Sequence, residues 1–150
     1  MPTDQEANPS TRRIAAHHER GNVHDVRIIS FGFLHGDAPA ADIVLDLRTH
    51  FRDPHVDPSL RHLTANDEAV RDAVRSTDGI PELTEAAADM VEAYLNGPSG
   101  EHPVTVAVGC AGGRHRAASV AMDLAAELDR GRSLVVTVLH RDIQLDVVDR

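Results

Sequence analysis

The sequence has no lysine, no tryptophan and only one cysteine among its 150 residues. Without lysine, the chain cannot form a P-loop that grips phosphate through a lysine, or a Schiff base with pyridoxal phosphate. A single cysteine, Cys110, excludes intrachain disulfides and zinc or iron–sulfur sites that need several cysteines. Aromatic residues make up only 3 %, so we expect no extended stacking platform for single-stranded nucleic acid.

Positive charge is also scarce. The 15 basic residues, all arginine, stand against 24 acidic residues, and the formal net charge is −9. Broad contact with nucleic-acid backbones or anionic membranes needs clustered basic residues, so this charge leaves room only for a small basic pocket. No apolar run approaches the roughly 20 residues that span a bilayer, and no signal-peptide pattern is visible. We therefore expect a cytoplasmic protein without membrane contact.

Length and pattern predict one domain with a hydrophobic core. We expect a flexible N-terminal tail over residues 1–24, a single domain over 25–143, and a short C-terminal tail over 144–150. Short runs rich in β-branched and apolar residues predict strands. These strands cover residues 26–33, 42–47, 104–108 and 134–139.

Apolar residues at a spacing near 3.6 predict helices between the strands. These helices cover residues 67–75, 81–96 and 115–130. In the second helix the apolar stripe includes Met90 and Tyr94, which we expect in the core. Alternating apolar strands and amphipathic helices predict an α/β fold, a three-layer sandwich around a mostly parallel sheet of about four strands. The link between the first two strands is short for a crossover, so their relative direction stays open.

A glycine-rich segment, G-C-A-G-G-R-H-R, joins the third strand to the third helix. Glycines permit a tight turn that directs N–H groups inward, and the following helix adds its positive end. Arginine forks match phosphate geometry and supply further donors. The segment therefore predicts an anion site, with a plain strand-to-helix turn as the alternative. Its candidate residues are Gly109, Cys110, Ala111, Gly112, Gly113, Arg114, His115 and Arg116.

Cys110 and Arg116 also have the Cys-x5-Arg spacing of cysteine-dependent phosphatases, in which a thiolate attacks phosphorus. Gly109 stands where those enzymes usually carry His, and Ala117 stands where Ser or Thr usually follows the arginine. We therefore favour a non-catalytic role, with Cys110 as a small buried residue beneath a phosphate cradle. A phosphatase that uses Cys110 is kept as an alternative.

Polar residues follow the other strands as well. His35 follows the first, Asp46 and Arg48 close the second, and His140 and Arg141 follow the fourth. In open α/β sheets, ligands bind outside the carboxyl ends of the strands, so parallel strands would gather these side chains beside the glycine-rich segment. We expect a pocket there, in which Asp46 accepts hydroxyl or ammonium groups. An Asp46–Arg48 ion pair and a surface His140 are the alternative. No metal-ligand spacing is present, so we expect no metal.

Several segments, in this order along the chain, resemble one known family. They are S-F-G-F-L-H-G at 30–36, D-I-V-L-D-L-R at 42–48, D-P-H at 53–55, L-R and L-T within 60–64, V-G-C-A-G-G-R-H-R at 108–116 and H-R-D at 140–142. Together they resemble the C-terminal domain of the RNase adapter protein RapZ, the YvcJ-like family. The resemblance spans about Ile28 to Asp142, which is most of the chain.

The resemblance implies a domain similar to a phosphofructokinase subdomain that binds glucosamine-6-phosphate. It also implies a ribonuclease or other protein partner, RNA contact and a homo-oligomer. The implied pocket comprises His35, the backbone of residues 111–113 and Arg116, with Asp46, Arg48, Arg114 and His115 as neighbours. The family's P-loop is not among these residues, so we expect no nucleotide cofactor. We predict a non-catalytic sensor of a sugar phosphate, with an RNA- or protein-binding adaptor without its own ligand as the alternative.

Overall fold

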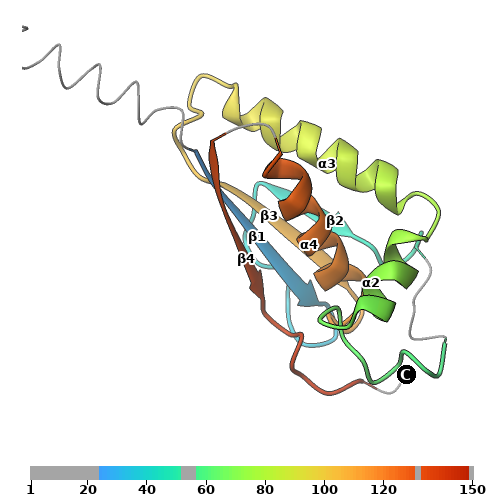
Figure 1. The fold of residues 1–150 in the computed structure, drawn as a ribbon. Coiled ribbons are helices and arrows are strands. Elements are labelled where there is room, and N and C mark those ends of the chain that lie inside the picture. Colours follow the sequence, from blue (N-terminus) through green and yellow to red (C-terminus); the bar gives the residue numbers. More distant parts are fainter. Residues whose placement is uncertain (1–23, 52–56, 131–132, 149–150) are drawn as a thin grey trace, which may run out of the picture.

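A computed structural model describes residues 24–51, 57–130 and 133–148 of the chain. The elements are β1 (His24–Gly32), β2 (Ile43–Asp46), α2 (Glu68–Arg75), α3 (Ile80–Leu95), β3 (Val104–Cys110), α4 (Arg116–Leu128) and β4 (Leu134–His140) (Figure 1). Every predicted strand and helix is therefore present, within a few residues of its expected bounds. The predicted N-terminal tail lies outside the described residues, except for His24.

The four strands form one sheet in the order β2-β3-β1-β4, and all neighbouring pairs are parallel. This confirms the α/β class and the predicted parallel sheet of four strands. It also gives the direction of β2, which runs parallel to β1 with β3 between them. The short link makes this crossover without a helix because β3 holds both of its ends. Leu34 N donates to Ala111 O at 3.0 Å, and Asp42 N donates to Thr105 O at 2.9 Å.

The helices α2, α3 and α4 contact one another and cover one face of the sheet (Figure 1). Side chains alternate along each strand, so every second strand residue points into this layer. The fully buried members of this core include Val26, Ile28, Val70, Val74, Val91, Val106, Val108, Val120 and Leu124. Ala117 and Ala121 of α4 are also fully buried, and their small side chains allow α4 to approach the sheet closely.

The prediction that Met90 and Tyr94 lie in the core is wrong, because they are 46 % and 47 % exposed. At about 100° per residue, the buried side of α3 centres between Thr84 and Val91, and both side chains fall on its flank. This flank lies beside β2, a strand of only four residues at the edge of the sheet. The Tyr94 hydroxyl donates to Asp42 O at 3.3 Å rather than packing inside. No described helix combines the length and hydropathy that a bilayer span requires.

Candidate functional site

The predicted polar residues do meet at one edge of the sheet, because all four strands are parallel. β1 leads into His35, β2 into Arg48 and β4 into Arg141, while β3 leads into the glycine loop, residues 111–115. After β1 the chain moves toward β2, and after β3 it moves the other way, toward β4. The carboxyl ends of β1 and β3 are therefore the topological switch point at which open α/β sheets bind ligands.

Glycines hold the loop against the sheet with no room for side chains. Gly113 has a φ of 77°, and a Cβ there would lie 2.7 Å from Gly32 N. A Cβ on Gly32 would lie 2.6 Å from Gly112 O. A Cβ on Gly109 would lie 2.6 Å from Cε2 of Phe33. The glycine loop is therefore fixed by direct backbone contact with the end of β1.

Gly112 differs from its neighbours because a Cβ there would meet no atom within 4 Å. Across the part of the chain that the structure describes, the backbone N–H groups of Ala111, Gly112 and Arg114 donate to no acceptor. The N-terminal end of α4 follows at Arg116. Open space beside uncommitted N–H groups and a helix N-terminus is the arrangement that binds anions in proteins.

Cys110 lies beneath the loop, and its thiol is buried. Its Sγ accepts the N–H of Gly113 at 3.2 Å and the N–H of Ala117 at 3.4 Å. One of these donors belongs to the loop and the other to the first turn of α4. The sulfur therefore ties the loop to the helix.

Arg114 and His115 use their side chains to hold neighbouring backbone. Arg114 donates from Nη1 to Leu145 O at 2.6 Å and from Nη2 to His62 O at 2.9 Å. His115 Nε2 lies 2.8 Å from Leu63 O, so this nitrogen carries the proton and donates it. Both residues were predicted as ligand donors. In this structure they clamp the segment around 62–63 and the C-terminal segment onto the glycine loop.

Arg116 lies beneath the segment that follows β2 and is only 3 % exposed. Its Nη1 donates to three backbone oxygens, Leu47 O at 3.1 Å, Arg48 O at 3.4 Å and Phe51 O at 3.2 Å. The side chain predicted to clamp phosphate therefore organises the β2 end of the edge. Its positive charge also contributes to lowering the pKa of Asp46.

Asp46 and Arg48 form an ion pair in which Arg48 Nη2 lies 2.7 Å from Asp46 Oδ2. The hydrogen bond from Arg48 is the main reason that the pKa of Asp46 falls below its ordinary value. The Arg48 guanidinium also stacks 3.6 Å from the centroid of the Phe33 ring. The Asp46–Arg48 ion pair was the alternative to a ligand-binding role in the sequence analysis, and both side chains remain partly exposed to solvent.

Asp142 is a buried residue of this edge that the site prediction did not include. Its carboxylate accepts the N–H of Gly32 at 2.8 Å and two N–H groups of Arg141 at 2.9–3.1 Å. Burial, the largest influence, would raise the pKa of Asp142, but these hydrogen bonds and the charges of Arg141 and His35 lower it overall. Arg141 in turn donates to Asp37 O at 2.6 Å. In the sequence, only the position of Asp142 in the H-R-D motif at 140–142 could have indicated that it belongs to this edge.

The two histidines of the edge differ in their partners. Nδ1 of His140 lies 2.6 Å from the Oγ of buried Ser30, and burial lowers the pKa of His140. Nε2 of His35 is buried and has no hydrogen-bond partner among the described residues. His35 therefore places at the site a buried nitrogen that forms no hydrogen bond with the described residues.

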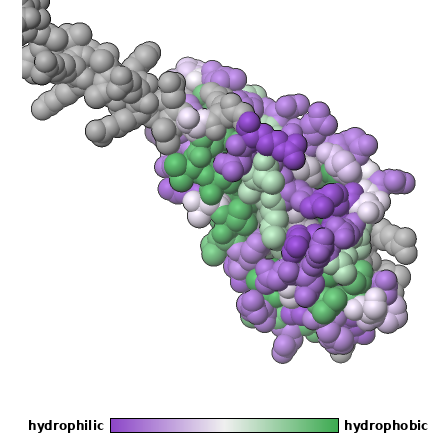
Figure 2. Space-filling model, viewed as in Figure 1, coloured by the Kyte–Doolittle hydropathy of each residue, from purple (hydrophilic) through white to green (hydrophobic). Residues whose placement is uncertain are grey.

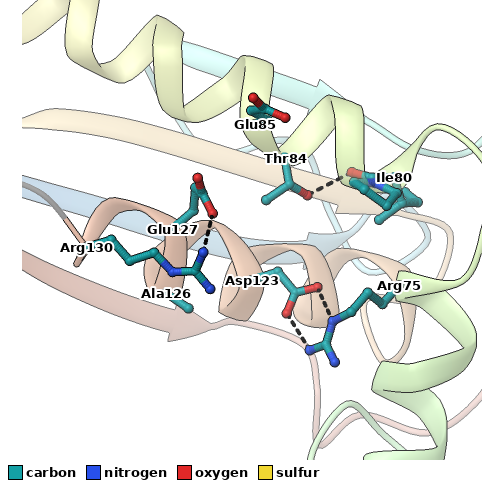
Figure 3. Close-up of a pocket in the computed structure, with 9 residues that line it drawn as sticks. Arg75, Ile80, Thr84, Glu85, Asp123, Ala126, Glu127 and Arg130 are labelled. Atoms are coloured by element: carbon teal, nitrogen blue, oxygen red, sulfur yellow. Dashed lines mark hydrogen bonds and ion pairs between the residues drawn. The ribbon is translucent and has the colours of Figure 1, made fainter.

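A separate hollow of about 600 Å³ lies between α3 and α4, near α2, with Thr84 on one side (Figure 3). Both arginines that line it are paired with carboxylates, since Arg75 pairs with Asp123 at 2.8 Å and Arg130 pairs with Glu127 at 3.6 Å. Among the described residues, no group of three or more His, Cys, Asp or Glu is placed to hold a metal ion. The strand-end edge, with its uncommitted donors, is therefore the better candidate site.

Comparison with known proteins matches residues 24–144 to a family model described as the RapZ C-terminal domain. A nucleotide-binding protein of Thermobifida fusca is 40 % identical over 118 residues, which cover 77 % of this chain and 40 % of that relative. A second, from Bifidobacterium longum, is 43 % identical over 119 residues, covering 78 % and 36 %. A third, from Limosilactobacillus reuteri, is 37 % identical over 129 residues, covering 85 % and 44 %.

The chain thus spans less than half the length of these relatives. The matched residues nevertheless contain every strand and helix of the fold, together with the glycine loop and the side chains around it. With this correspondence across most of its length, the chain belongs to the family of the RapZ C-terminal domain.

Proposed function

We propose that this domain is a non-catalytic regulatory module that binds a small phosphorylated metabolite, an amino-sugar phosphate such as glucosamine-6-phosphate, at the glycine loop. The observation that carries the proposal is the open space at Gly112, beside N–H groups that donate to no acceptor within the described residues. Backbone amides at a helix N-terminus bind phosphate without any lysine, which suits a chain that has none.

Two side chains of the edge suit the sugar portion of such a ligand. His35 offers a buried Nε2 without a partner in the described structure, which can bind a sugar hydroxyl. Asp46 has a lowered pKa and stays ionised at neutral pH, so its carboxylate can accept from an ammonium group. A ligand with phosphate at one end and an amine at the other would satisfy both kinds of group.

The relatives are named nucleotide-binding proteins, and this domain covers less than half of each. Of nucleotide binding, the residues of this domain support only the binding of a phosphate group. A P-loop for a nucleotide needs a lysine that the chain does not contain. RNA contact, a ribonuclease partner and a cytoplasmic location stay predictions.

A binding role fits the geometry of the Cys-x5-Arg segment better than hydrolysis does. The Cys110 sulfur is buried and accepts two backbone N–H groups, and Nη1 of Arg116 is committed to three carbonyl oxygens. Neither group is arranged to attack or clamp a phosphate ester. Release of inorganic phosphate from the ligand by the native chain, lost in Cys110→Ser, would contradict the non-catalytic role.

Calorimetric titration with glucosamine-6-phosphate, inorganic phosphate and glucosamine tests the proposal. We expect binding of the sugar phosphate, weaker binding of phosphate and none of glucosamine. In Gly112→Asp the new Cβ meets no atom within 4 Å, so we expect the fold to persist, and the added negative charge should weaken binding of a phosphate at least tenfold. Ser99→Asp adds the same charge at an exposed turn and is the control. No heat with any ligand at millimolar concentration, or equal affinity in both variants, would refute the proposal.

A further inference from the structure

Arg141, the residue that follows β4, binds the segment that carries His35. Its backbone N–H donates to Ser30 O at 2.9 Å, which places the side chain beside the end of β1. From there Nη1 donates to Asp37 O at 2.6 Å, and Nη2 donates to Gly36 O at 3.3 Å. The segments that follow β4 and β1 therefore lie side by side (Figure 1).

The segment after His35 has little other support. Leu34, Gly36 and Asp37 are exposed, so side-chain packing contributes little to holding them. Figure 2 shows mostly hydrophilic residues, with separate apolar patches, at the end of the molecule toward which the strands of Figure 1 point. Before His35, Leu34 N donates to Ala111 O. Among the described residues, Arg141 makes the only hydrogen bonds to the backbone of residues 36–41.

Asp142 fixes the direction of the Arg141 guanidinium. Its carboxylate accepts Nε at 3.0–3.1 Å and Nη2 at 2.9 Å, a two-pronged contact that a lysine cannot reproduce. The Asp142 side chain is buried and also accepts the N–H of Gly32. The Phe31 ring lies on the guanidinium, with 5.2 Å between Cζ and the ring centroid. The guanidinium is therefore held in one orientation, from which it reaches the two carbonyls beyond His35.

We propose that Arg141 is a positioning residue that holds His35 at the ligand site and so gives the site its selectivity for a sugar phosphate over phosphate alone. This inference rests on the proposed function. The phosphate would contact the glycine loop, and the described hydrogen bonds of the Arg141 side chain include none with that loop.

The sugar would contact His35, whose buried Nε2 has no hydrogen-bond partner among the described residues. A hydrogen bond weakens steeply as its angle departs from linear, so this nitrogen must be held in place to recognise a hydroxyl. The sequence analysis expected Arg141 itself to bind the ligand. Its contacts assign it instead to supporting a residue that does.

Calorimetric titration of Arg141→Gln with glucosamine-6-phosphate and with inorganic phosphate tests the selectivity. We expect the affinity for the sugar phosphate to fall by about tenfold or more, because His35 loses its fixed place, and the affinity for phosphate to fall by less than about threefold. Arg141→Lys keeps the charge beside Asp142, which favours an intact fold, but it should show the same loss of selectivity. Arg75→Gln is the matched control, since Arg75 also pairs with a carboxylate but lines the separate hollow between α3 and α4.

A double-mutant cycle shows whether Arg141 acts through His35. In a His35→Ala background, Arg141→Gln should change the affinity for the sugar phosphate by less than about threefold. Equal effects in both backgrounds, or an equal loss of affinity for phosphate, would overturn this inference and leave the proposed function standing. A native chain that binds neither ligand would refute the proposed function and this inference with it.

Nuclear magnetic resonance relaxation of the backbone amides needs no ligand. In the native chain, the amides of residues 36–38, 40 and 41 should have order parameters near about 0.85, the value of rigid backbone. In Arg141→Gln these values should fall below about 0.6, while Arg75→Gln should leave them unchanged. Native values in Arg141→Gln would show that Arg141 does not hold this segment, whichever ligand the site binds.

Discussion

Replacing Gly113 with alanine should be one of the most destabilising small changes in this domain. The residue has a φ of 77°, in a region where a Cβ costs about 1–2 kcal/mol. The new Cβ would also lie 2.7 Å from Gly32 N and 2.9 Å from Phe31 C, both backbone atoms that cannot move aside alone. Overpacking of this kind costs about 1–3 kcal/mol, so we expect a total loss of roughly 2–5 kcal/mol.

The adjacent Gly112 provides the matched control, because a Cβ there meets nothing within 4 Å. Gly112→Ala should change the free energy of unfolding by less than about 1 kcal/mol in either direction. Urea unfolding followed by circular dichroism, with a shared slope, measures both variants. Equal midpoints for the two variants would refute the argument that the loop is fixed by backbone contact with β1.

Two further predictions concern stability. Arg116→Ala should lower the free energy of unfolding by about 3 kcal/mol even without ligand, because three carbonyl oxygens lose a buried charged donor. Arg48→Ala removes an exposed ion pair and should lower the free energy of unfolding by less than about 1 kcal/mol. Equal losses for Arg116→Ala and Arg48→Ala in urea unfolding would contradict the structural role of Arg116. Burial lowers the pKa of His140, so the unfolded chain takes up this proton first, and stability should fall as the pH drops below about 6.5. His140→Gln should reduce the difference in urea midpoint between pH 7.5 and 5.5, and an unchanged difference would show that other groups cause it.

Much of the fold was predictable because its signals are local. The strand Val104–Cys110 is almost continuously apolar, and six of its seven residues are buried in the structure. Pro81 lies in the first turn of α3, and Gly97 follows its last residues, as the predicted bounds required. Parallel strands then gather their carboxyl ends by geometry alone, which is why His35 and the glycine loop were expected together.

The roles of individual side chains were less predictable, because they depend on what packs above them. Arg114, His115 and Arg116 read as ligand donors in a sequence, yet each bonds to backbone carbonyls of segments distant along the chain. Met90 and Tyr94 fit the apolar stripe predicted for α3. The buried side of α3 is narrower than that stripe, because the neighbouring edge strand β2 has only four residues. Asp142 is a charged residue whose burial follows only from the end of β1 and Arg141.

The sequence by itself determined the class of fold and the place of the glycine-rich turn that we propose as an anion site. Hydrophobic periodicity, β-branched runs and glycines act through neighbours only a few residues away, so they can be read along the chain. Only the tertiary structure decided the strand order, which glycine borders open space, and which polar atoms are already used. Those properties arise where segments far apart in the chain compete for the same volume and the same hydrogen bonds, and no local pattern records the outcome.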